Sequence, residues 1–147
     1  MILWILGLSA CPLHVLKGHR GSVMELKFSP SEPHLLVIWD SSSDVRLFDP
    51  VKGNCLHVFQ CKPNPPTNSV HPSYPSYASY GWFENNNILF SPNGRLLACR
   101  GETIKMFNVE TRKIAAIYRL KSKMMCWSSD SDKFCIVTKH FVTTYDV

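Results

Sequence analysis

The segments LKFSP (residues 26–30), ILFSP (88–92) and MCWSS (125–129) are three versions of one pattern, an apolar run that ends in an aromatic residue and a turn. Each is followed 17 to 20 residues later by a second aromatic residue with Asp or Asn after it, at Phe48-Asp49, Phe107-Asn108 and Tyr145-Asp146. Self-similarity at a regular interval is the signature of a repeat architecture. The chain is therefore predicted to repeat one structural unit.

Alternation of apolar and polar residues predicts that the unit is made of β-strands. In VRLF (45–48) and TIKMF (103–107) the two kinds of residue exchange at a period of two, which is typical of half-buried strands. Turn residues such as SPNG (91–94) separate the runs, and no segment keeps a 3.6-residue period long enough for a helix. We expect an all-β chain with strands at 2–6, 13–16, 22–28, 35–39, 44–49, 55–59, 87–90, 96–100, 103–108, 114–118, 124–127, 133–138 and 142–147.

The expected strands group in fours. Phe90 and Trp127 are 37 residues apart, close to the roughly 40 residues of a four-stranded propeller blade. Phe28 and Phe90 are 62 apart, and the excess lies in residues 61–86, which hold half of the ten prolines. We expect one propeller-type segment over residues 1–147, with a partial blade at 1–21, blades at 22–60 and 87–120, a partial blade at 121–147, and a Pro/Ser/Tyr-rich insert at 61–86.

These units resemble WD repeats. LKGH (16–19) is similar to the Gly-His opening of such a repeat, and FSP (28–30) is similar to the turn after its first strand. VRLFD (45–49) lies where the family has its Trp-Asp ending, with Phe in place of Trp. IKMFN (104–108) and VTTYD (142–146) match the same strand more loosely. The resemblance implies about three four-stranded antiparallel blades of a partial or open β-propeller.

The resemblance also implies which residues hold the blades together. In WD repeats a His, a Ser or Thr, an Asp and a Trp form a hydrogen-bonded group of four. Phe48 has no indole N–H to donate, and Ser42 stands where the Asp is expected, with Asp44 as a nearby substitute. The literal Trp39-Asp40 pair falls at the end of the second strand, outside the pattern. The expected structural residues are Gly18, His19, Asp44, Phe48, Asp49, Phe107, Tyr145 and Asp146.

Three blades are fewer than the four to eight of a closed propeller. The resemblance therefore implies that this chain is a fragment of a longer propeller. Open sheet edges carry unpaired backbone groups that invite association. We expect marginal stability of the chain alone, or dependence on a partner chain.

Length, composition and charge fit one globular domain. The chain has 147 residues, 45% of them hydrophobic, and a net charge of +5 that permits an anionic partner without requiring one.

The six cysteines are spread through apolar runs, which favours reduced thiols in an intracellular protein, cytoplasmic or nuclear. One alternative is a disulfide framework in a secreted protein, which the even count of cysteines allows. Another is export as a lipoprotein cleaved before Cys11, although no Lys or Arg precedes Lys17. The apolar run at 1–10 is too short to span a bilayer, so we expect no membrane partner.

Enzyme signatures are missing from the sequence. It has no Gly-rich phosphate loop, no Gly-x-Ser-x-Gly motif and no His-Glu-x-x-His motif, and its acidic residues are scattered. We therefore expect no enzymatic activity, no cofactor, no metal and no small-molecule substrate. The alternative is a metal or redox site at Cys55, His57 and Cys61, with His71 as a fourth zinc ligand. A spacing of two residues would place Cys55 and His57 on one face of a strand.

Two segments are candidate binding surfaces. In the insert, Tyr74, Tyr77 and Tyr80 are three residues apart and would form one ridge on a polyproline II helix, although a solvated linker explains them too. A second segment, which we call the basic strip, could contact phosphate or an acidic peptide, or could be a solvated strand and loop. The basic strip consists of Arg112, Lys113, Arg119, Lys121 and Lys123.

The repeat resemblance and the lack of catalytic motifs together favour one class of function. We expect a non-enzymatic scaffold that presents propeller loops to a partner protein, as a subunit of a complex. The alternative is nucleic-acid or phosphate binding through the basic strip, which would make affinity fall steeply with salt.

Overall fold

The computed structural model describes residues 2–3, 13–31, 33–61 and 87–147. Within these residues every regular element is a β-strand, so the expected all-β fold is confirmed. The strands are β1 (Ile2–Leu3), β2 (His14–Val15), β3 (Val23–Phe28), β4 (Leu36–Asp40), β5 (Asp44–Asp49), β6 (Asn54–Gln60), β7 (Ile88–Phe90), β8 (Leu96–Arg100), β9 (Ile104–Asn108), β10 (Ile114–Tyr118), β11 (Met124–Trp127), β12 (Lys133–Val137) and β13 (Val142–Asp146).

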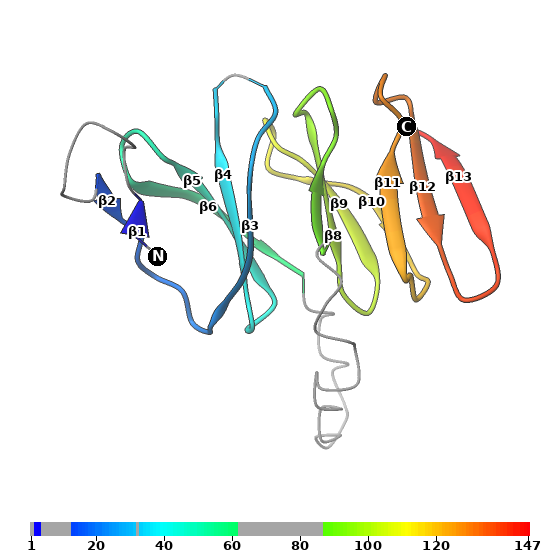
Figure 1. Ribbon diagram of the computed structural model, residues 1–147, viewed down its shortest axis with the longest axis horizontal. Helices are drawn as coiled ribbons and strands as arrows, with labels where there is room; N and C mark the ends of the chain where they lie inside the picture. Colours follow the sequence, from blue (N-terminus) through cyan, green and yellow to red (C-terminus); the bar gives the residue numbers. More distant parts are fainter. Residues whose placement is uncertain (1, 4–12, 32, 62–86) are drawn as a thin grey trace, which may run out of the picture.

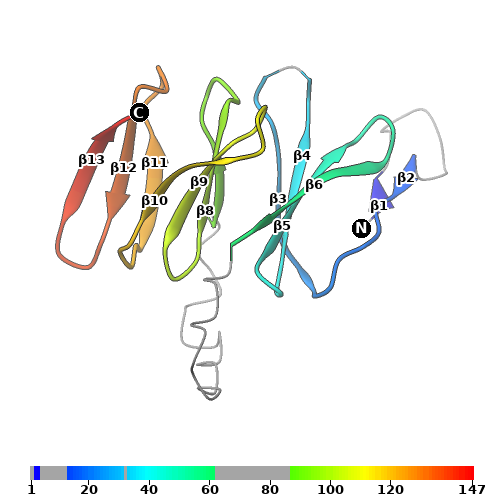
Figure 2. The ribbon, with the colours of Figure 1, turned by 180° about the vertical axis from the view of Figure 1, so that it is seen from behind.

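The strands pair with their neighbours in the chain, always antiparallel. β3 to β6 form a four-stranded sheet, the first blade; β7 to β10 form the second blade, and β11 to β13 form a three-stranded third blade. β1 and β2 form a separate two-stranded sheet. Figure 1 and the reverse view in Figure 2 show the three blades standing side by side in chain order, as in an open fan.

The blades are joined by apolar layers between them. Val37, Leu47 and Phe59 of the first blade pack against Leu97 and Phe107 of the second, and all five side chains are buried. A separate cluster joins the second blade to the third, and its buried members are Ala98, Ile104, Met106, Met125, Phe134 and Ile136. Burial of such layers is the main favourable contribution to folding.

The central strand β8 serves both layers, because successive side chains of a strand point to opposite faces. Leu97 and Cys99 belong to the layer shared with the first blade, whereas Ala98 belongs to the layer shared with the third. A strand buried on both faces needs a continuous apolar run rather than strict alternation. This explains the composition of the segment at 96–99.

The repeated turn after the first strand of each blade has a structural purpose. The Oγ of Ser91 accepts a hydrogen bond from the N–H of Leu96 (3.0 Å), and the Oγ of Ser128 accepts one from the N–H of Lys133 (2.9 Å). The turns also contact each other, since the N–H of Asn93 donates to the Oγ of Ser131 (3.0 Å). The repeated serines therefore close the turns, and the bond between Asn93 and Ser131 links the turns of the second and third blades.

The eleven strands expected between residues 22 and 147 are all present, with ends within one residue of their expected positions. The segment at 13–16 forms the short strand β2. Of the segment at 2–6, residues 2–3 form β1, and residues 4–6 lie outside the described residues, as do Cys11 and the insert from residue 62 onward. The exact limits of the blades stay a prediction.

Candidate binding groove between two blades

The polar centre of the first blade is Asp40, which the WD resemblance left outside the pattern. Its side chain, at the end of β4, is fully buried. The Nη1 of Arg46 donates to its Oδ2 at 2.7 Å, and Arg46 is itself almost completely buried. The Nδ1 of His19 lies 3.8 Å from the same oxygen, whereas the carboxylate of Asp44 lies at the edge of the cluster, 3.5 Å from Arg46.

Backbone and hydroxyl donors complete the surroundings of Asp40. Its Oδ1 accepts hydrogen bonds from the N–H (2.9 Å) and the hydroxyl of Ser42, and its Oδ2 accepts one from the N–H of Arg20 (3.3 Å). Burial disfavours the charged form and is the largest single influence, yet the bonds from Ser42 and Arg20 with the charge of Arg46 outweigh it. The pKa of Asp40 therefore lies below its usual value.

Gly18 and Phe48, two further residues expected to hold the first blade, lie next to His19, in sequence and in space respectively. Gly18 adopts a φ of +99°, in the left-handed region that glycine tolerates best. Phe48 is buried with Leu16 and Ile38, and its ring centroid is 5.7 Å from that of His19. Phe48 thus contributes apolar packing to the first blade, and the buried Arg46–Asp40 pair contributes its polar contacts.

The Asp or Asn that follows the second aromatic residue of each repeat has a separate role. The Oδ1 of Asp49 accepts hydrogen bonds from two turn amides, and the Oδ1 of Asn108 accepts one from the N–H of Thr111 (2.8 Å). These side chains close the turns before β6 and β10. In the third blade Tyr145 packs on a neighbouring tyrosine ring, and Asp146 is exposed and pairs with a lysine.

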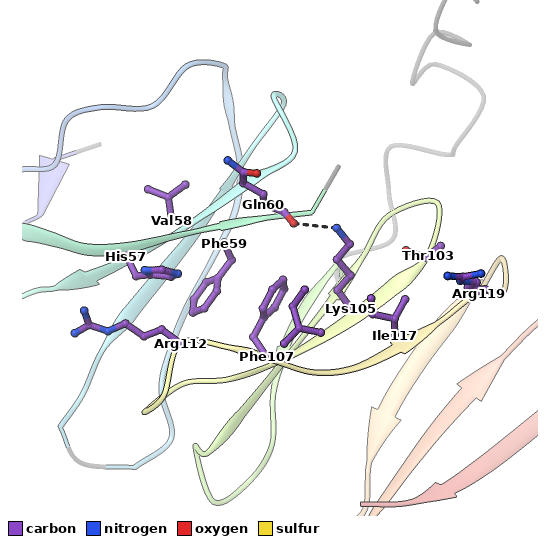
Figure 3. Close-up of a pocket in the computed structure, with 11 residues that line it drawn as sticks. His57, Val58, Phe59, Gln60, Thr103, Lys105, Phe107, Arg112, Ile117 and Arg119 are labelled. Carbon is purple, nitrogen blue, oxygen red and sulfur yellow. Dashed lines mark hydrogen bonds between the residues drawn. The ribbon is translucent and has the colours of Figure 1, made fainter. Parts of the chain in front are cut away.

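A groove lies between the first and second blades. β6 forms one side of it, and β9 and β10 form the other. Figure 3 shows its side chains. Its volume is about 440 Å³. The lining residues are His57, Val58, Phe59, Gln60, Thr103, Lys105, Phe107, Arg112, Ile114, Ile117 and Arg119.

The buried side of the groove is lined by aromatic rings, and its exposed apolar surface is formed by isoleucines. The rings of Phe59 and Phe107 lie 4.6 Å apart between centroids and are 1% and 3% exposed. Ile114 and Ile117, both on β10, are 52% and 47% exposed. The groove therefore offers a ligand aliphatic side chains, with a packed aromatic layer beneath.

Three cationic side chains stand along the groove. The Nζ of Lys105 donates to the carbonyl oxygen of Gln60 at 3.1 Å, and the Nη1 of Arg112 donates to that of Leu56 at 3.2 Å. Arg119 is exposed where β10 ends. The lining contains no Asp or Glu. The groove therefore presents positive charge to solvent.

Two partly buried histidines have pKa values below the usual value for the side chain. Burial, and then Arg46, lower the pKa of His19; burial, and then Arg112, lower the pKa of His57. Both groups therefore contribute stability above their unfolded pKa of about 6.5, and lose it as the pH falls through the lowered folded pKa.

We expect the free energy of unfolding, measured by urea titration, to decrease between about pH 7.5 and about pH 5. His19→Gln and His57→Gln should each remove part of this decrease, because the amide does not titrate in that range. A free energy that is flat or rises as the pH is lowered would contradict the assignment.

The structure divides the predicted basic strip. Arg112 and Arg119 line the groove, whereas Lys113, Lys121 and Lys123 are exposed and are not part of its lining. The structure also adds residues from outside the strip, above all Lys105 and His57. The signal for Lys105 was its polar position in the alternating strand at 103–107. Tyr74, Tyr77 and Tyr80 lie outside the described residues.

The predicted placement of Cys55 and His57 on one face is wrong. A shift in register within the β5–β6 pair sets His57 opposite Leu47 but Cys55 opposite Phe48, so the two side chains point to opposite faces. Cys61 is buried between the blades, where its thiol contacts Cys99. His71 lies outside the described residues, and in the part of the chain that is described no three His, Cys, Asp or Glu residues gather as metal ligands.

The cysteines are free thiols wherever the structure describes them. Cys61 and Cys99 are buried, Cys135 is half-buried, and Cys55 and Cys126 are exposed. Burial raises the pKa of Cys99 well above its usual value, and the neighbouring Cys61 adds to this effect. No helix in the described ranges is long and apolar enough to cross a membrane.

Side-by-side antiparallel sheets joined by apolar layers define the blades of a β-propeller. Residues 10–49 match the family described as WD domain, G-beta repeat. Over 100 residues, 68% of this chain, the sequence is 32% identical to human apoptotic protease-activating factor 1, but the match covers only 7% of that protein. The chain is thus a WD-repeat segment of a β-propeller.

Comparison with solved structures agrees on the fold. The structure titled "Structure of U3-55K" superposes with a TM-score of 0.63 and 17% sequence identity. The match covers 90% of this chain and 38% of that chain. The chain thus spans well under half the length of both proteins that it resembles. WD repeats generally mediate interactions between proteins.

Proposed function

We propose that this chain is a non-enzymatic interaction scaffold, and that a partner protein docks in the groove between the first and second blades. The observation that carries the proposal is the lining: exposed isoleucines beside Lys105, Arg112 and Arg119, with no acidic residue. Arginine and exposed apolar side chains around a concave site are typical of protein-binding surfaces. The volume is also in the usual range for a ligand site.

The proposal predicts that an apolar contact at Ile117 matters for binding. Peptides selected on the full 147-residue chain from a random display library should bind at least about tenfold more weakly to Ile117→Ser. The smaller hydroxyl side chain removes exposed apolar surface without changing the charge of the groove. Fluorescence anisotropy of the labelled peptides measures the effect.

Val142→Ser in the third blade is the matched control. Val142 is 69% exposed, also lies on a strand, and belongs to a blade that does not line the groove. Its substitution should leave peptide binding unchanged. If the selected peptides bind wild type, Ile117→Ser and Val142→Ser with equal affinity, docking in the groove is contradicted.

Nucleic-acid or phosphate binding is the second candidate, because the same three cations could contact phosphates. Sequence-tolerant binding of single strands relies on exposed aromatic faces on which bases stack. Phe59 and Phe107 are too deeply buried to offer such faces. We therefore favour a protein partner, and expect oligothymidine to bind weakly with an affinity set by salt.

A further inference from the structure

We infer that the occupant of the groove is an extended acidic segment of the partner, with apolar side chains between acidic ones. This inference rests on the proposed function, because it names the chemistry of the partner at the same site.

The cations are spread along the groove rather than gathered at one point. Arg112 precedes β10 and Arg119 follows it, with Lys105 on the neighbouring strand; Figure 3 shows Arg112 and Arg119 toward opposite ends, with Ile117 and Phe107 between them. The five residues of β10 that lie between the two arginines, Ile114–Tyr118, extend over about 16 Å at about 3.3 Å per residue. The groove therefore matches an extended segment with acidic groups toward both ends and apolar groups between them.

Two of the three cations donate hydrogen bonds to neutral groups. Lys105 and Arg112 donate to backbone carbonyl oxygens of β6. A carboxylate forms stronger, charge-assisted hydrogen bonds with arginine, which is also able to bind both of its oxygens at once. A carboxylate in the groove would therefore offer Lys105 and Arg112 stronger hydrogen bonds than these carbonyl groups do.

These same bonds make pairing of a partner strand with β6 unfavourable. β6 is an edge strand of the first blade, and the carbonyl groups of Leu56 and Gln60 are engaged by side chains from the second blade. Basic side chains at a sheet edge hinder the addition of another strand. The segment should therefore be recognised through its side chains rather than by main-chain pairing.

Arg112 has a left-handed backbone conformation, and the equivalent position in the first blade is a glycine. The turns before β6 and β10 begin at Asp49 and Asn108, and the residue four places later has a left-handed conformation in both: Gly53 at φ +70° and Arg112 at φ +60°. Glycine adopts this conformation without the steric cost that a side chain brings. The arginine at this position therefore carries a steric cost in the turn, and its side chain lines the groove.

The inference predicts that stability and binding separate in Arg112→Gly. A fluorescein-labelled peptide Asp-Glu-Ile-Leu-Glu-Asp should bind the full chain at least about tenfold more tightly than Asn-Gln-Ile-Leu-Gln-Asn, by fluorescence anisotropy. Arg112→Gly should lose about tenfold in affinity for the acidic peptide, while its melting temperature stays equal or rises. Arg119→Gln should lower the affinity for the acidic peptide as well.

Ser131→Gly is the matched control, because Ser131 has a φ of +68° in a turn of the third blade, away from the groove. It should leave peptide binding unchanged. Equal binding of the acidic and neutral peptides, with selected peptides still sensitive to Ile117→Ser, would overturn this inference and leave the proposed function standing. Oligothymidine that binds more tightly than the acidic peptide and competes with it would overturn both.

Discussion

Asp40→Ala should destabilise the fold by about 3–5 kcal/mol, because it leaves the guanidinium of Arg46 buried without its anionic partner. Asp40 is fully buried, only 6% of the Arg46 side chain is exposed, and the two groups are 2.7 Å apart. Removal of one member of such a pair costs far more than the pair itself contributes. Urea denaturation followed by tryptophan fluorescence measures the loss, which is large beside a typical total stability of about 5–15 kcal/mol.

A double variant distinguishes the unpaired charge from a general defect. Asp40→Ala combined with Arg46→Leu should recover much of the stability lost in Asp40→Ala alone, since no guanidinium is then left buried without the Asp40 carboxylate. The exposed pair of Lys133 and Asp146 is a matched control, because its N–O distance is also 2.7 Å. Asp146→Ala should leave the denaturation midpoint unchanged. Equal losses in Asp40→Ala and in the double variant would contradict the role of the buried pair.

The strands were predictable because each one leaves its own pattern in the chain. The alternation at 103–107 and the apolar run at 96–99 each mark a strand, and turn residues mark their ends. The repeat then places equivalent strands in successive blades without any knowledge of contacts. All of these signals are local, or periodic over the length of one blade.

The polar centre of the first blade was not predictable in the same way. Asp40 stands beside Trp39 and looks like a displaced copy of the family motif, while its donors Arg20 and Arg46 lie on either side of it in sequence. The usable signal was Arg46, a charged residue inside the mostly apolar run at 45–48. Such a residue on a buried strand requires a buried counter-charge.

The groove depends on how two blades lie against each other, which no local pattern encodes. Lys105 and Gln60 are 45 residues apart, and Arg112 and Leu56 are 56 apart. The register shift in β6 is a further obstacle, because it reverses the face of Cys55 relative to His57. The sequence therefore indicated basic residues near β10 but could not assign them to one site.

Phe134→Ala should also cost about 3–5 kcal/mol, because it opens a cavity in the layer between the second and third blades. Phe134 is fully buried, and its ring centroid lies 4.8 Å from that of Trp127 and 5.8 Å from that of Tyr118. Tyr118 belongs to the second blade, so this ring ties the third blade to the rest of the chain. Urea denaturation gives the change in free energy.

Hydrogen exchange should show where the stability is lost. Because the third blade shares its core only with the second among the described residues, amides of β11 to β13 should exchange much faster in Phe134→Ala, with a smaller change in β3 to β6. Phe141→Ala is the control of equal chemistry, since Phe141 is 71% exposed and its truncation removes no buried contact of this layer. Equal acceleration of exchange in the first and third blades would instead mean that the three blades unfold as one unit. Phe134 would then have no special role in holding the third blade.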